Sequence, residues 1–118
     1  ELIAKKEFDE KFKTLNRQTM VFNPHACHQF LDRHKNMNQR RLQYFVDKVH
    51  ELDLKTAQYY LVFSKSLDFG MILNKNASGK IFVVTVLPKG KKFPKPDTEL
   101  VLVENKNVQI IIIDENFE

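Results

Sequence analysis

The spacing of apolar residues changes once along this 118-residue chain, near residue 57. Before that point, apolar residues recur every three or four positions, as on one face of a helix. After it, they recur at every second position, as in strands. Because the helical part and the extended part follow each other without alternating, the sequence predicts an α+β fold. The length suits one core, so we expect a single domain over residues 1–118.

Three helices are expected in the N-terminal part. The second has a clear start, because Asn23 can cap free backbone amides and Pro24 suits the first helical position. Asn38 is a plausible cap for the third, which carries the most regular apolar stripe of the chain. Residues 16–22 look like a connector. The predicted helices span residues about 2–15, 24–35 and 39–53.

The C-terminal part contains short segments rich in Val, Ile, Leu, Phe and Tyr, separated by turn residues such as Asn, Gly, Ser and Pro. Short loops favour pairing between consecutive strands, so we expect an antiparallel β-meander of four to five strands. The helices would pack their apolar stripes on one face of this sheet. The predicted strands span residues about 57–65, 68–74, 80–87, 98–104 and 108–114.

Composition excludes several classes of protein. The longest apolar run, Ile110 to Ile113, is far shorter than the roughly 20 residues of a membrane-spanning helix. The first twenty residues are rich in charge, so we expect neither a signal peptide nor a membrane partner. A single cysteine, Cys27, excludes an internal disulfide and a multi-cysteine zinc site, and suits a reducing cytoplasm. We therefore expect a cytoplasmic protein.

Charge is distributed unevenly. Residues 57–95 carry seven lysines against one acid, Asp68, whereas residues 96–118 carry six acids against Lys106. A basic segment of this kind predicts a polyanionic partner at one surface. The alternative is a lysine-rich face that only keeps the protein soluble.

The four histidines all lie between residues 25 and 50. In the second helix, His25, His28 and Asp32 share one face, on which the carboxylate could orient an imidazole for proton transfer. The alternative is a solvated face with an ordinary ion pair. On the opposite, apolar face lie His34 and Cys27, which we interpret as core residues. The glutamate of the His-Glu-x-x-His motif is missing, so we expect no metal and no other cofactor.

A second candidate site is the segment Pro88 to Pro96. Gly90 gives it flexibility, its lysines could bind phosphates, and its aromatic residue could stack on a base. Arginines of the second and third helices would add positive charge if they lie nearby. The predicted nucleic-acid-binding residues in these segments are Arg33, Arg40, Arg41, Lys89, Lys91, Lys92 and Phe93.

The runs Phe22-Asn23-Pro24-His25-Ala26 and Phe30-Leu31-Asp32-Arg33, followed by an amphipathic helix and strands, resemble small endoribonucleases of the RelE and RegB type. These belong to the barnase/EndoU/colicin/RelE superfamily. The resemblance covers residues 22–88. In it, His25 or His28 matches the histidine that opens the helix, and His50 matches a second one on the next helix. Lys65, Lys80 and Lys91 are the nearest substitutes for arginines that many RelE-type toxins carry on the sheet, and Lys65 is therefore a further predicted nucleic-acid-binding residue.

The resemblance implies a metal-independent endoribonuclease of phage or toxin type. One imidazole would take a proton from an RNA 2′-hydroxyl, and a second would protonate the departing 5′-oxygen, leaving a 2′,3′-cyclic phosphate. Lys91 or Arg33 would stabilise the charge on the phosphate. Besides RNA, an inhibitor or a host protein is an expected partner.

Two other interpretations fit the same sequence. In the first, the chain is a non-catalytic RNA- or protein-binding module of phage or bacterial origin, which uses the basic segment and in which the histidines are incidental. In the second, it is a structural protein that pairs through the strand Val108 to Ile113. The sequence predicts no oligomeric state.

Overall fold

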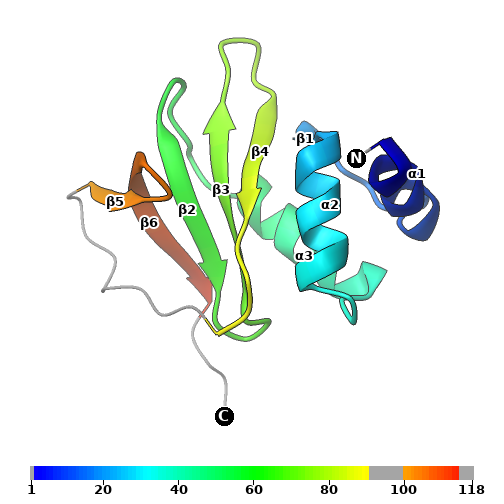
Figure 1. The fold of residues 1–118 in the computed structure, drawn as a ribbon. Helices are drawn as coiled ribbons and strands as arrows, with labels where there is room; N and C mark the ends of the chain where they lie inside the picture. Colours follow the sequence, from blue (N-terminus) through cyan, green and yellow to red (C-terminus); the bar gives the residue numbers. More distant parts are fainter. Residues whose placement is uncertain (1, 91–99, 115–118) are drawn as a thin grey trace.

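The computed structural model describes residues 2–90 and 100–114, and within them it confirms the α+β class and the N-terminal position of the helices (Figure 1). The helices are α1 (Leu2–Lys11), α2 (Pro24–Arg33) and α3 (Gln39–His50). The strands are β1 (Met20–Phe22), β2 (Tyr59–Ser64), β3 (Phe69–Lys75), β4 (Ile81–Val86), β5 (Val101–Val103) and β6 (Lys106–Asp114).

The sheet is mixed, and the prediction of a purely antiparallel meander of four to five strands is wrong. Its six described strands follow the order β1-β4-β3-β2-β6-β5. β2, β3 and β4 pair antiparallel, as expected for short turns, but β1 runs parallel to β4 and β6 runs parallel to β2. β5 follows β4 in the chain but forms the edge of the sheet that lies away from β1. The β5–β6 hairpin is therefore added to the sheet beside β2, and β6 runs parallel to β2.

Several element boundaries also differ from the prediction. β1 lies within residues 16–22, which the sequence presents as a connector, because three residues are too few to show a period of two. α1 ends at Lys11, before the predicted residue 15. The turn between β5 and β6 consists of Glu104 and Asn105, both at positive φ, 51° and 64°. Two successive positive φ values give the turn twist that matches an antiparallel hairpin.

The two predicted helix caps are confirmed. Asn23 Oδ1 accepts a hydrogen bond of 2.8 Å from the backbone amide of Ala26 at the start of α2. Asn38 Oδ1 accepts one of 2.9 Å from the amide of Arg41 at the start of α3. Each cap satisfies an amide that has no partner inside the helix, and each typically contributes about 1 kcal/mol. The caps therefore fix the points at which α2 and α3 begin.

Phenylalanine rings join the helices to one face of the sheet. Phe8 of α1 contacts Phe22 of β1 at 4.8 Å between ring centroids and Phe30 of α2 at 5.3 Å. Phe69 of β3 contacts both Phe30, at 5.6 Å, and Phe45 of α3, at 4.8 Å. These rings are fully buried or nearly so. The packing places α2 beside the sheet and α1 outside α2 (Figure 1).

A second, smaller apolar cluster lies on the other face of the sheet. It is built on Leu61, Ile72, Val108 and Ile110, at the alternate positions of β2, β3 and β6. Central strands with both faces buried carry almost continuous apolar sequence. This explains why, contrary to the expected period of two, the runs from Tyr60 to Phe63 and from Ile110 to Ile113 are continuously apolar.

Candidate functional site

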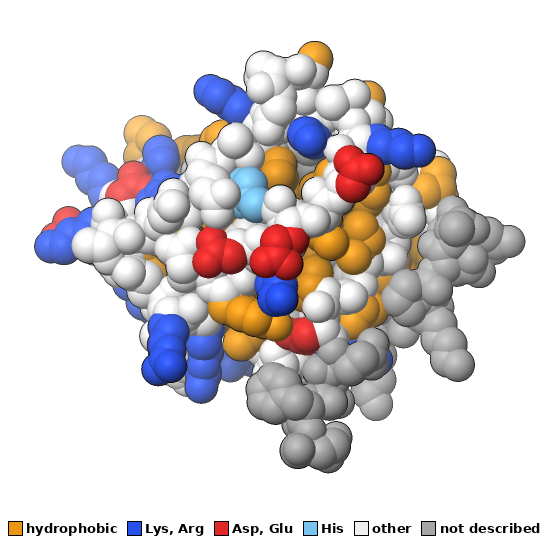
Figure 2. Space-filling view, turned by 180° about the vertical axis from the view of Figure 1, so that it is seen from behind, with side chains coloured by type: hydrophobic (Ala, Val, Ile, Leu, Met, Phe, Trp, Pro, Cys, Tyr) orange, Lys and Arg blue, Asp and Glu red, His pale blue; other side chains and the backbone are white. Residues whose placement is uncertain are grey.

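Five of the predicted nucleic-acid-binding residues come from segments that meet at one end of the molecule. This end is the lower one in Figure 1, where α2 passes into α3, β2 turns into β3, and β4 and β6 finish. We call this surface the basic edge and define it by Arg33, Arg40, Arg41, Lys65 and Lys89. Seen from behind, lysine and arginine side chains also gather on the side where α2 passes into α3 (Figure 2). Four separate chain segments thus contribute positive charge to one end of the fold.

A cavity of about 400 Å³ lies within the basic edge, between the first turns of α3 and the β2–β3 turn. Arg40 and Arg41 line one side, and no described residue forms an ion pair with either guanidinium. Both side chains are exposed to solvent. The remaining lining residues are Asn38, Tyr44, Ser66 and Leu67. We call this cavity the arginine pocket.

The back of the arginine pocket is organised by Asp114, the last residue of β6. Its Oδ2 atom accepts hydrogen bonds from Ser66 Oγ at 2.7 Å, from Ser64 Oγ at 2.8 Å and from Tyr44 Oη at 2.8 Å. Its Oδ1 atom accepts one from the Ser66 backbone amide at 3.1 Å. One carboxylate therefore connects β6, the β2–β3 turn and α3.

The hydrogen bonds keep Asp114 ionised. Partial burial alone would raise its pKa, but the bonds donated by Ser66, Ser64 and Tyr44 outweigh burial and leave the pKa below its ordinary value. The same arrangement raises the pKa of the Tyr44 hydroxyl, because its proton is held by the carboxylate. At neutral pH the cluster thus has a charged carboxylate surrounded by neutral hydroxyl donors.

A second acid near the basic edge, Asp68, is also engaged in hydrogen bonds. Asp68 is the last residue of the β2–β3 turn, at φ 51°, and both of its carboxylate oxygens accept from the Gly90 amide, at 3.1 and 3.2 Å. This ties the chain after β4 to the turn. Arg33 has a positioning contact of its own, donating from Nη1 to the Val86 carbonyl at 2.6 Å. Arg40 and Arg41, by contrast, are exposed and form no ion pair within residues 2–90 and 100–114.

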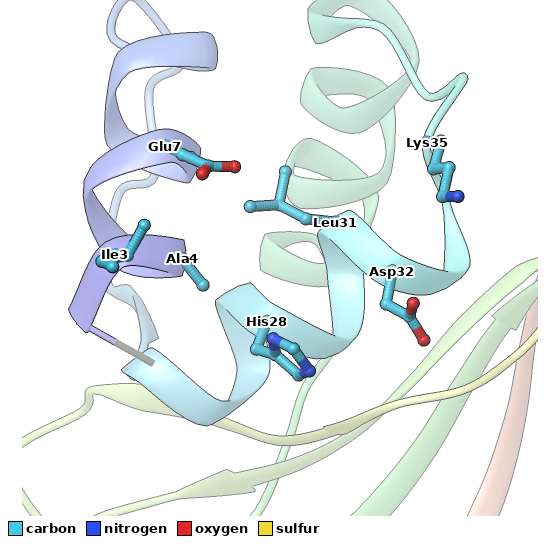
Figure 3. A pocket seen from close by; sticks show the side chains of 7 residues that line it. All are labelled: Ile3, Ala4, Glu7, His28, Leu31, Asp32 and Lys35. Carbon is cyan, nitrogen blue, oxygen red and sulfur yellow. The ribbon is translucent and has the colours of Figure 1, made fainter.

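A second cavity, of about 330 Å³, lies between α1 and α2 (Figure 3). His28 and Asp32 of α2 line it together with Glu7 of α1, and Leu31 lies between the two helices. No hydrogen bond joins His28 to Asp32 within the described residues. Of the predicted group His25, His28 and Asp32, His28 and Asp32 line this cavity and His25 does not, and the expected orienting bond between His28 and Asp32 is not formed.

His50 and His34 connect separate parts of the fold. His50 Nδ1 donates to the Val46 carbonyl at 2.8 Å, and Nε2 accepts from the Thr19 hydroxyl at 2.8 Å and the Thr19 amide at 3.2 Å. Both of its nitrogens are thus occupied, and His50 does not line the cavity that contains His28. His34 is buried, as predicted, and its Nε2 bonds to the Leu87 carbonyl at 2.6 Å. His25 is exposed at the start of α2.

Lys91, Lys92 and Phe93 of the predicted phosphate-binding segment lie outside the described residues. Sequence reasoning named Arg40 and Arg41 but missed Tyr44 and Ser66, which also line the arginine pocket, and Asp114, which accepts from their hydroxyls. The one available signal was Asp114 itself, an acid that directly follows four isoleucines. Its partners are 48, 50 and 70 residues away in the chain, so no local pattern connects them.

Two further classes of site were tested on the described residues. No three histidine, cysteine, aspartate or glutamate side chains among residues 2–90 and 100–114 lie close enough to hold a metal ion. None of the described helices is long and apolar enough to cross a membrane.

Comparison of the chain with protein-family models, with curated proteins and with solved structures found no match. The resemblance to small endoribonucleases therefore stays a prediction. Any function for this chain has to be argued from the geometry of its own residues.

Proposed function

We propose that the chain is an RNA-binding protein that contacts the phosphate backbone through the basic edge. The observation that carries this proposal is the arginine pocket, in which two exposed guanidinium groups lie beside hydroxyl groups and an aromatic ring. Arginine binds phosphate through a planar fork of donors, and such contacts supply much of the affinity for nucleic acids.

The acids near the pocket do not cancel its positive charge in the way an ion pair would. Asp114 and Asp68 direct their carboxylates at hydroxyls and backbone amides of the fold, whereas Arg40 and Arg41 extend from the helix surface. The first turn of α3 contains no acidic residue. The partial positive charge at the N-terminus of this helix therefore adds to the positive charge of the two arginines. An anion entering the pocket thus meets donors that no described acid already occupies.

The size of the pocket favours a nucleotide unit over a small inorganic anion. Its volume of about 400 Å³ is within the range of pockets that enclose organic ligands. Leu67 and the Tyr44 ring supply apolar surface next to the arginines. Lys65 and Lys89 lie on neighbouring segments of the same edge, where adjacent phosphates of a longer strand would pass.

The test is binding of a short, fluorescently labelled, mixed-sequence single-stranded RNA, measured by polarisation at several salt concentrations in excess EDTA. Arg40→Ala/Arg41→Ala should weaken binding at least about tenfold and reduce the slope of log K against log salt by about 0.7, the contribution of the one phosphate that the two arginines hold. The matched control is Lys6→Ala/Lys80→Ala, which removes the same charge from exposed positions on α1 and the β3–β4 turn. No binding by the unmodified protein, or equal losses in both variants, would contradict the proposal.

A second candidate function is the cleavage of RNA, and the cavity that contains His28 favours it. His28, Glu7 and Asp32 line one cavity, which combines an imidazole with two carboxylates, the groups used in general acid–base catalysis. One group would take the 2′-hydroxyl proton as the 2′-oxygen attacks phosphorus, and another would protonate the departing 5′-oxygen. The product would be a 2′,3′-cyclic phosphate. In this version His50 positions Thr19 and stays outside the reaction.

The same RNA distinguishes the two candidates. Discrete fragments ending in a cyclic phosphate, formed in EDTA by the unmodified protein and not by His28→Ala, would establish cleavage. RNA that is bound but stays intact would support binding and exclude cleavage. RNA cleaved equally well by His28→Ala would remove His28 from the reaction.

A further inference from the structure

The arginine pocket is asymmetric in its hydrogen-bonding groups, and this asymmetry identifies the part of a nucleotide that it can recognise. Arg40 and Arg41 offer only donors, because a guanidinium group has no acceptor. Tyr44 and Ser66 each carry a hydroxyl, which has one proton to donate and lone pairs to accept with. What these hydroxyls offer to a ligand depends on where their protons are already used.

Both protons are committed to Asp114. An ionised carboxylate can only accept, so the bonds of 2.8 Å from Tyr44 Oη and 2.7 Å from Ser66 Oγ must each use the hydroxyl proton. Ser64, which is fully buried, also donates to the same oxygen, at 2.8 Å, and its Oγ lies 3.1 Å from Ser66 Oγ. Because each serine lies closer to the carboxylate than to the other serine, we assign both serine protons to Asp114. The lowered pKa of Asp114 keeps this assignment valid at neutral pH.

The pocket therefore combines guanidinium donors with hydroxyl oxygens that are acceptors. A phosphate fits the arginines. The hydroxyl oxygens require a ligand group that donates, within one sugar of that phosphate. In a nucleic acid, the 2′-hydroxyl of ribose meets this requirement, and it is the group that distinguishes RNA from DNA.

We propose that Ser66 Oγ and Tyr44 Oη accept a hydrogen bond from a ribose 2′-hydroxyl while Arg40 and Arg41 hold the adjacent phosphate, so that the pocket selects RNA over DNA. This inference rests on the proposed RNA-binding function and adds to it the group that is recognised. Asp114 acts as a positioning residue, since it turns both hydroxyl protons away from the ligand.

The test compares three labelled oligonucleotides of equal length that contain only uracil bases: oligouridine, its 2′-deoxy form and its 2′-fluoro form. A 2′-fluorine can accept weakly but cannot donate, and it keeps the RNA-like sugar conformation. We expect the 2′-deoxy and 2′-fluoro strands to bind about fivefold to tenfold more weakly than oligouridine, the usual effect of one lost hydrogen bond. Equal binding of the 2′-fluoro strand and oligouridine would mean that sugar shape is recognised, and would overturn the inference.

Variants identify the acceptors. Ser66→Ala and Tyr44→Phe should each reduce the preference for oligouridine over the 2′-deoxy strand and leave the salt slope unchanged, because the arginines are retained. Ser78→Ala, at an exposed position of the β3–β4 turn, is the matched control and should keep the full preference. If either variant fails to fold, the other provides the test, and circular dichroism identifies which is folded.

The failure of this inference differs from the failure of the proposed function. Equal binding of the ribo and deoxy strands, or a preference that survives both substitutions, overturns the recognition of the 2′-hydroxyl and leaves phosphate binding in place. The absence of binding to all three strands overturns both. A preference lost in Ser66→Ala or Tyr44→Phe but kept in Ser78→Ala supports the inference.

Discussion

His34 is an ionisable residue that is buried against aromatic rings. It is only 1% exposed, lies against the rings of Phe30 and Phe69, and uses Nε2 to donate to the Leu87 carbonyl. The other ring nitrogen, Nδ1, has no hydrogen-bond partner among the described residues. Burial lowers the pKa of His34, and this effect outweighs the opposing effect of the bond to Leu87. The imidazole is therefore neutral in the folded protein at neutral pH.

This environment predicts a loss of stability in mild acid. The folded pKa is lower than the unfolded value of about 6.5, so the unfolded chain takes up a proton first as the pH falls. The contribution of His34 is complete above about pH 6.5 and declines below it. Urea unfolding between about pH 7 and pH 5 should show a falling free energy of unfolding.

The substitution that tests this is His34→Gln, whose amide can still donate to the Leu87 carbonyl but does not titrate. The variant should lose most of the pH dependence between about pH 7 and pH 5, and His28→Gln, at an exposed position, should retain it. An unchanged slope in His34→Gln would show that other groups cause the dependence.

At the scale of elements, Gly70 allows β2 and β3 to pack closely. A Cβ atom at this position would lie 2.8 Å from Phe63 Cδ1 and 3.2 Å from the Val62 carbonyl oxygen. Phe63 lies directly opposite Gly70 in the antiparallel pair, and Leu87 closes the site at 3.4 Å. The phenyl ring thus occupies the space in which a side chain on β3 would stand.

Gly70→Ala should therefore destabilise the protein by about 1–3 kcal/mol, the usual cost of overpacking a core. Chemical denaturation followed by circular dichroism would measure the change. Phe63→Leu/Gly70→Ala should be less destabilised than the sum of the two single variants, because the smaller side chain makes room for the new methyl group. If the destabilisation of the double variant equals the sum for the two single variants, the contact with Phe63 is not the cause of the loss of stability.

The elements also show what could be read from the sequence. The helix starts at Asn23 and Asn38 were predictable, since caps are local chemistry. The order of the strands was not, because the apolar run from Ile110 to Ile113 suits burial beside any strand and carries no information on its neighbour.

In the candidate site the exposed arginines were predictable from charge. The cluster around Asp114 was not, because its four bonds join segments that only the folded sheet brings together.

At the scale of the whole molecule, the two apolar clusters share the same strands. β2 and β3 send alternate side chains to the helix side and to the opposite face, as Val62 and Leu61 show. Neither cluster can be disrupted without exposing strands that the other requires. The arginine pocket depends on the same arrangement, since α3, the β2–β3 turn and β6 all contribute to it. We therefore expect the chain to unfold as one cooperative unit.

Cys27 provides a probe of this cooperativity. It is the one cysteine of the chain, is fully buried between the helices and the sheet, and has a pKa that burial raises to about 11. Because the thiolate is the reactive form, the folded protein should react with a disulfide reagent such as DTNB only through unfolding. As urea is increased, the midpoint of thiol labelling should coincide with the midpoint of circular dichroism. Labelling at low urea, before the dichroism changes, would show instead that the helices separate from the sheet while the strands stay paired.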